Sequence, residues 1–145
     1  KQPKMKTKAR TLIQRVNKAP LHLILGLDLI ITGLILLTHR HYFFWPPWPK
    51  WIVAVENNIL IGLIGVLAGV GMLYWAISTD KSIKLNRKLI PTASAYYTLL
   101  AATEFLHGFF APLGTPHMFT SGLSELIMTL ITLYMARNSP THYDG

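Results

Sequence analysis

Long apolar runs separated by short polar segments dominate this chain, and they predict helices that cross a membrane. A helix needs about 20 predominantly apolar residues to span the hydrocarbon of a bilayer. Four stretches are long enough, and we expect spans at about residues 21–38, 52–77, 89–111 and 116–136. We therefore predict an all-α fold, an integral membrane four-helix bundle with four transmembrane helices in residues 20–137.

Aromatic residues and prolines fill the segment 39–51, between the first two predicted spans. Three prolines there exclude a regular helix. Amphipathic rings settle at the headgroup level of a bilayer, so we interpret this segment as interfacial. Two further aromatic residues mark the end of the second span. The expected interfacial anchors are Tyr42, Phe43, Phe44, Trp45, Trp48, Trp51, Tyr74 and Trp75.

Basic residues lie mostly on one side of the predicted bundle. The tail 1–19, the loop after the second span and the polar tail 138–145 with its flanking Arg137 hold seven, four and one of them. The other side holds only Arg40 and Lys50. Because positively charged loops stay on the inner side, we predict a multi-pass protein of the cell membrane with both termini cytoplasmic.

The N-terminal tail, residues 1–19, contains no acid, and its apolar residues recur at helical spacing. A basic amphipathic helix lying on anionic lipids of the inner leaflet fits this pattern. A solvated tail that only fixes orientation is the alternative. In both interpretations the basic residues that give the net charge of +8 serve the membrane, and nucleic acid is not the expected partner.

Three predicted spans each carry an acid, namely Asp28, Glu104 and Glu125. At a rise of about 1.5 Å per residue, all three lie roughly 10–15 Å below the outer surface. The predicted spans contain no Lys or Arg to pair with them. An ionisable side chain inside a bilayer is costly, so its presence indicates a functional or structural role.

Hydroxyl and imidazole groups follow the same helical stripes as these acids. Three arrangements remain open: protonated acids hydrogen-bonded to the hydroxyls, a water-lined path that holds a cation or passes protons, or contact with a basic group of a partner chain. The candidate buried polar cluster is Asp28, Thr32, Tyr97, Glu104, His107, Ser121, Glu125 and Thr129.

Glu104 and His107 have the Glu-x-x-His spacing found in di-iron helix bundles. Such centres need two of these motifs and two more acids, whereas this chain has one motif, to which Glu125 could add a ligand. We therefore predict no metal and no cofactor, apart from bound lipid. No nucleophile elbow, HExxH motif or phosphate-binding glycine loop occurs, so we do not expect an enzyme.

Glycines recur along the second span at Gly62, Gly65 and Gly69. Small residues at such spacing allow the backbones of two membrane helices to approach closely. The spacing predicts a helix-packing surface. It fits packing within the chain as well as association between copies.

The sequence His-Tyr-Phe-Phe-Trp-Pro-Pro at residues 41–47 resembles a segment of small multi-span membrane proteins from phages of Gram-positive bacteria. This resemblance implies a phage-type role, such as lysis or exclusion of other phages. It implies no catalytic residues.

The last predicted span has a continuous polar face formed by Ser121, Glu125, Thr129 and Thr132. This face favours a non-enzymatic protein that self-associates, such as a holin-like oligomer that permeabilises the membrane. One alternative is a proton or cation channel, or a transporter subunit, that uses the buried acids. Another is an accessory or immunity-type subunit that binds another membrane protein.

Overall fold

The computed structural model describes residues 17–39, 54, 57–110 and 117–139. Most of these residues lie in helices, and none of them lies in a strand, which confirms the all-α prediction for this part of the chain. The aromatic segment at 42–51, residues 1–16 of the N-terminal tail and residues 140–145 lie outside it. The helices are α2 (Pro20–Thr38), α4 (Ile59–Ile77), α5 (Ile83–Phe110) and α6 (His117–Asn138).

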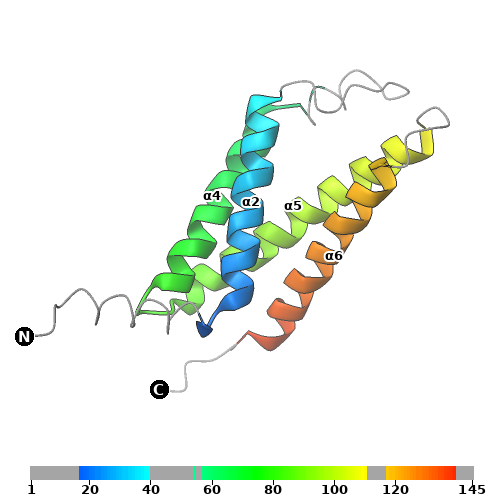
Figure 1. The fold of residues 1–145 in the computed structure, drawn as a ribbon. Helices are drawn as coiled ribbons and strands as arrows, with labels where there is room; N and C mark the ends of the chain where they lie inside the picture. Colours follow the sequence, from blue (N-terminus) through cyan, green and yellow to red (C-terminus); the bar gives the residue numbers. More distant parts are fainter. Residues whose placement is uncertain (1–16, 40–53, 55–56, 111–116, 140–145) are drawn as a thin grey trace, which may run out of the picture.

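The helices run in alternating directions and form two hairpins, which lean away from each other (Figure 1). α2 packs along α4, and α5 packs along α6. The hairpins are joined mainly by α4 against α5, whereas α2 and α6 touch only briefly. The start of α2, the start of α5 and the end of α6 therefore share one end of the bundle, and α2 and α6 leave space between them.

Glycines bring the backbones of α2 and α4 into direct contact. A Cβ atom on Gly33 would lie 2.7 Å from the carbonyl oxygen of Gly62. A Cβ atom on Gly69 would lie 2.6 Å from the carbonyl oxygen of Gly26. Even a methyl group would not fit at these positions. Glycine, which has no side chain, therefore allows the close approach on which membrane helix packing depends.

The third predicted packing glycine, Gly65, contacts both α2 and the other hairpin, since a Cβ atom there would lie 3.2 Å from the Cα atom of Gly33. A Cβ atom there would lie 2.5 Å from the hydroxyl oxygen of Tyr96 on α5. The glycines of α4 are thus covered by α2 and α5 within one chain. This packing leaves them unavailable as the contact between copies that we considered from the sequence.

The surface of the bundle is apolar, as in a protein surrounded by lipid. Leu67, Ile31 and Leu130 expose 69%, 57% and 57% of their area. Residues buried between the hairpins include Leu25 and Tyr97. Apolar contacts hold the hairpins together, and more apolar side chains point outward than a water-soluble monomer of this size would expose.

Three helices are long and apolar enough to cross a membrane: α2, α4 and the part of α6 from Phe119 to Asn138. α5 is not among them, so length and composition support three of the four predicted spans. The physical reason is the polarity of α5, because Glu104 and hydroxyl-bearing residues interrupt its apolar sequence. The latter are Thr92, Ser94, Tyr96, Tyr97, Thr98 and Thr103.

The bounds of α5 also differ from the predicted 89–111. The helix begins at Ile83, and Pro91 lies inside it rather than in its first turn, where we had placed it. The polar residues 83–88 continue the helix beyond the apolar run. Proline lacks the amide N–H that an interior position would donate, so this site gives up one helical hydrogen bond.

Candidate functional site

Asp28 and Tyr97 form a hydrogen bond between the two hairpins. The Tyr97 hydroxyl donates to Oδ2 of Asp28 at 2.8 Å, and the carbonyl oxygen of Leu25 lies 3.4 Å away. Tyr97 is fully buried, and Asp28 is half-buried. The phenol therefore supplies the acid of α2 with a hydroxyl partner from α5, as one of our three arrangements requires.

A cavity of about 200 Å³ lies next to this pair, between α2, α5 and α6. Glu104 of α5 and Glu125 of α6 line it together. Thr32 and Ser121 add hydroxyl groups, and the remaining lining is apolar. Four members of the predicted polar cluster thus meet at one cavity. Its apolar lining residues are Ile35, Leu36 and Leu100.

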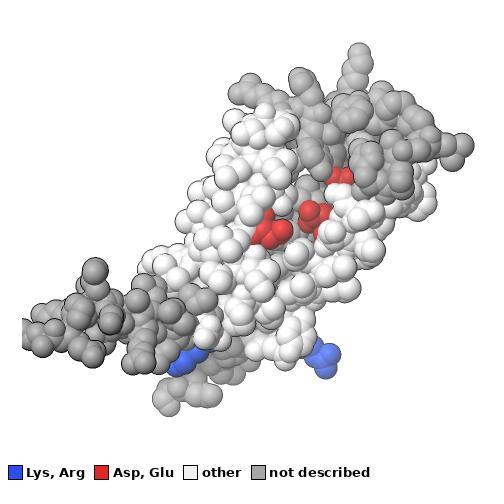
Figure 2. Space-filling model, viewed as in Figure 1, with Lys and Arg blue, Asp and Glu red and all other residues white. Residues whose placement is uncertain are grey.

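Close packing of α5 and α6 places the two glutamates beside each other. A Cβ atom on Gly122 would lie 3.3 Å from the Cβ atom of Glu104, so the helices approach closely one turn from Glu125. Glu125 interacts electrostatically with both Glu104 and Asp28. Acidic side chains are visible in the middle of the face between the hairpins, whereas Lys and Arg appear only at its lower end (Figure 2).

The two glutamates are differently buried. Glu104 exposes only 3% of its area, whereas Glu125 is half-buried. Among the described residues, Oε2 of Glu125 is buried and has no hydrogen-bond partner. A buried polar atom without a partner is unusual and calls for a proton, a water molecule or an ion. No Lys or Arg is among the residues that line the cavity.

His107 is placed apart from the cavity lining. It is buried, and its Nδ1 atom lies 2.7 Å from the carbonyl oxygen of Thr103, one turn earlier on α5. Within the described part of the chain, no three His, Asp or Glu residues are arranged to hold a metal ion. A three-ligand metal site formed by Glu104, His107 and Glu125 therefore gains no support.

The polar face of α6 turns into the bundle. Thr129 and Thr132 are buried, and their hydroxyls donate to the carbonyl oxygens of Glu125 and Thr129 at 3.0 and 2.7 Å. Their hydrogen bonds are thus made within α6. Ser121 and Glu125 continue this face toward the cavity. The part of this polar face formed by Thr129 and Thr132 is therefore covered within one chain and needs no second chain.

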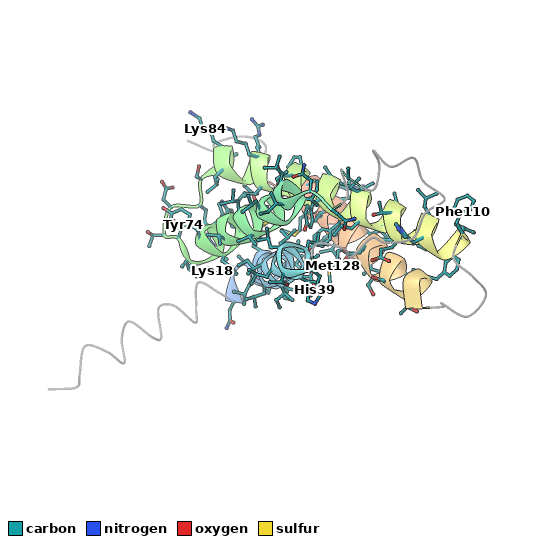
Figure 3. The ribbon with its side chains drawn as sticks, turned by 90° about the horizontal axis from the view of Figure 1, so that it is seen from above. Lys18, His39, Tyr74, Lys84, Phe110 and Met128 are labelled. Atoms are coloured by element: carbon teal, nitrogen blue, oxygen red, sulfur yellow. The ribbon has the colours of Figure 1, made fainter. Side chains whose placement is uncertain are left out.

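The two predicted anchors in α4 have different surroundings. Tyr74 is 61% exposed and points away from the other helices (Figure 3). Trp75 instead stacks on His22 of α2, with ring centroids 4.0 Å apart. Its indole N–H donates to the carbonyl oxygen of Ser82. Trp75 therefore links the end of α4 to the start of α2 and to the connection before α5.

A chain of polar side chains at the same end was not anticipated from the sequence. Nε2 of His22 and Oδ1 of Asn86 are 2.8 Å apart, and Nδ2 of Asn86 donates to the Ser139 hydroxyl at 3.1 Å. These three residues link the start of α2, the start of α5 and the end of α6. They are far apart in sequence and belong to no motif, so no local signal pointed to them.

Comparison of the chain with protein-family models, with curated proteins and with solved structures finds no match. The geometry of the site is therefore the basis for assigning a function.

Proposed function

We propose that this protein holds a small cation, or exchanges protons, at a carboxyl site inside the membrane. The observation that carries the proposal is the cavity lined by Glu104 and Glu125. Two carboxyl groups that share one site in a low dielectric repel each other when both are ionised. A proton or a cation between them relieves this repulsion. Thr32 and Ser121 supply further oxygen atoms at the same cavity.

Asp28 adds a third carboxyl group near this site, one helical turn before Thr32 on α2. It interacts electrostatically with Glu125 and accepts a hydrogen bond from Tyr97. A proton or cation that leaves the two glutamates would meet this third carboxyl group next. Acids within a membrane bundle are typical of ion pathways and proton relays. A conducting protein or a transporter subunit is the function that this arrangement supports best.

The holin-like oligomer remains a second candidate with less support. It was motivated by the polar face of α6 and by the glycines of α4, and both are covered within one chain over much of their length. An accessory subunit would dock through the basic tail or the aromatic segment 39–51. Nearly all of these residues lie outside the described part of the chain.

Flux measurements test the proposal. Purified protein in liposomes should carry protons or monovalent cations when a membrane potential is applied, with an internal dye as the readout. Glu125→Gln and Glu104→Gln should each lower this flux to the level of empty liposomes, because an amide cannot take up a proton or balance a cation. Asp80→Asn, an exposed acid outside the helices, is the matched control and should leave flux unchanged.

Absence of flux in the parent protein would refute conduction. Equal flux in the parent and in both glutamine variants would refute the assignment of the site.

We further propose that all four helices cross the bilayer, with both termini on the cytoplasmic side. The helices alternate in direction (Figure 1), and α5 carries its acid into a cavity rather than toward lipid. Every Lys and Arg of the described residues lies at or next to the end where α2 and α5 begin. Retention of basic residues on the inner side supports this orientation.

Labelling of single cysteines tests this topology in cells. The chain has no cysteine of its own, so each introduced thiol reports without background. A membrane-impermeant reagent should label His39→Cys, at the outer end of α2, in intact cells. It should label Thr79→Cys, at an exposed position between α4 and α5, only after the cells are opened. Labelling of Thr79→Cys in intact cells would overturn the orientation.

A further inference from the structure

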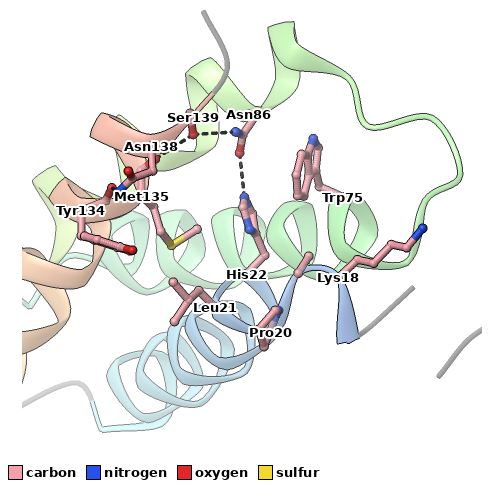
Figure 4. A pocket seen from close by; sticks show the side chains of 11 residues that line it. Lys18, Pro20, Leu21, His22, Trp75, Asn86, Tyr134, Met135, Asn138 and Ser139 are labelled. Carbon is pink, nitrogen blue, oxygen red and sulfur yellow. Dashed lines mark hydrogen bonds between the residues drawn. The ribbon is translucent and has the colours of Figure 1, made fainter. Parts of the chain in front are cut away.

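We propose that an anionic phospholipid of the inner leaflet binds in a pocket at the basic end of the bundle. This pocket has a volume of about 250 Å³ and lies between the start of α2 and the end of α6. We call it the inner pocket (Figure 4). It is separate from the carboxyl cavity, and the inference does not depend on ion conduction.

The back of the inner pocket is held in place by contacts between helices. His22 stacks on Trp75 and is hydrogen-bonded to Asn86, which in turn donates to Ser139 (Figure 4). Trp75 is fixed by its own hydrogen bond to the carbonyl oxygen of Ser82. Because these side chains already hold one another, a ligand would find much of the site preformed, which lowers the entropic cost of binding.

The charge of the pocket matches a negatively charged headgroup. Lys18 lines it, and no Asp or Glu does. Lys81 lies nearby, with its ammonium group 4.4 Å from the centre of the Trp75 ring. Asn138 and Ser139 add polar groups on the α6 side of the pocket, across from Lys18 (Figure 4). Lysine side chains near the inner surface attract anionic lipids.

The pocket has apolar walls, which favour a lipid over a soluble anion. Leu21 and Met135 give it an apolar side, and Tyr134, which is 62% exposed, stands at its edge. α2 and α6 make few contacts, so the apolar side chains near the pocket are not covered by tight packing between these two helices. Ile24 is exposed one turn further along α2. A headgroup at Lys18 would thus leave an acyl chain lying against apolar side chains.

Lipid titration followed by native mass spectrometry tests this inference on the full chain in detergent. Phosphatidylglycerol should bind in one copy at lower concentration than phosphatidylcholine. Lys18→Glu should weaken phosphatidylglycerol binding by about tenfold, since it reverses one charge at the surface. Lys84→Glu is the matched control, with the same charge change at an exposed lysine outside the pocket, and should shift binding less than about twofold.

A second variant, Asn138→Trp, fills the pocket without changing charge and should also weaken binding. Equal binding of the two lipids, or equal effects of Lys18→Glu and Lys84→Glu, would overturn the proposal. Displacement of the lipid by millimolar glycerol phosphate would show a site for a soluble anion instead. Glu104→Gln and Glu125→Gln should bind the lipid as the parent does, which separates this test from the flux experiment.

Discussion

Replacing Gly69 with alanine should destabilise the protein by about 2 kcal/mol, because the added methyl group meets backbone that cannot move aside. Its Cβ would lie 2.6 Å from the carbonyl oxygen of Gly26 and 2.9 Å from the amide nitrogen of Ile30. The whole of α2 would have to shift away from α4. Unfolding of the purified protein in detergent, titrated with dodecyl sulfate and followed by near-ultraviolet circular dichroism, measures this loss.

Gly71→Ala provides the matched control on the same helix. A Cβ there would approach only a terminal methyl group of Leu89, at 2.6 Å, and that side chain can rotate away. Its effect on the free energy of unfolding should stay below about 1 kcal/mol, and the higher helix propensity of alanine favours the variant. Equal destabilisation by the two substitutions would show that backbone contact between α2 and α4 does not determine stability.

This packing also explains how the acids come together. Close contact within each hairpin fixes the rotation of α2 on α4 and of α5 on α6, and thereby which faces meet between the hairpins. Asp28 then points at Tyr97, and Glu104 and Glu125 reach one cavity. A loss of packing between α2 and α4 should therefore disturb the carboxyl site as well, although no glycine lines it.

The acid site could largely be predicted from the sequence, because depth along a helix follows from residue number. Asp28, Glu104 and Glu125 were expected at one level, and the structure brings Glu125 within electrostatic range of the other two. Which hydroxyl met which acid could not be predicted. That pairing depends on the rotation of each helix about its axis, and only tertiary packing fixes this rotation.

The polarity of α5 has a related physical reason. Residues 89–111 have the length of a span, but their composition is mixed, and α5 is shielded along one face by the other helices. Buried Thr103 and Tyr96 show that this shielding allows more polar groups than a helix surrounded by lipid would carry. The length of this stretch and its apolar start predict a span. Burial by neighbouring helices cannot be read from a single sequence.

The inner pocket lay beyond sequence analysis altogether. His22, Asn86 and Ser139 each resemble ordinary polar residues near the end of a helix. Their contacts arise because α2, α5 and α6 begin or end at the same level of the bundle. Such a site follows from the lengths of the helices and from the angle between the hairpins, and neither is encoded in any one stretch of the chain.

The central claim is that a polar cavity lies inside a bundle whose outer surface contacts lipid. Thr32 and Ile31 are neighbours on α2 and differ in depth by only about 1.5 Å. Thr32 lines the cavity with the two glutamates, whereas Ile31 is 57% exposed on the outer surface. Introduced cysteines at these two positions should therefore meet water in one case and acyl chains in the other.

The rate at which a positively charged, water-soluble thiol reagent modifies Thr32→Cys and Ile31→Cys in liposomes is the most direct measurement. A thiol reacts as its thiolate, and a charge is costly in hydrocarbon, so the cavity position should react about a hundredfold faster. A small monovalent cation added at high concentration should slow the reaction at Thr32→Cys, because it competes with the reagent for the cavity. Faster modification of Ile31→Cys, or equal rates at both positions, would contradict the account.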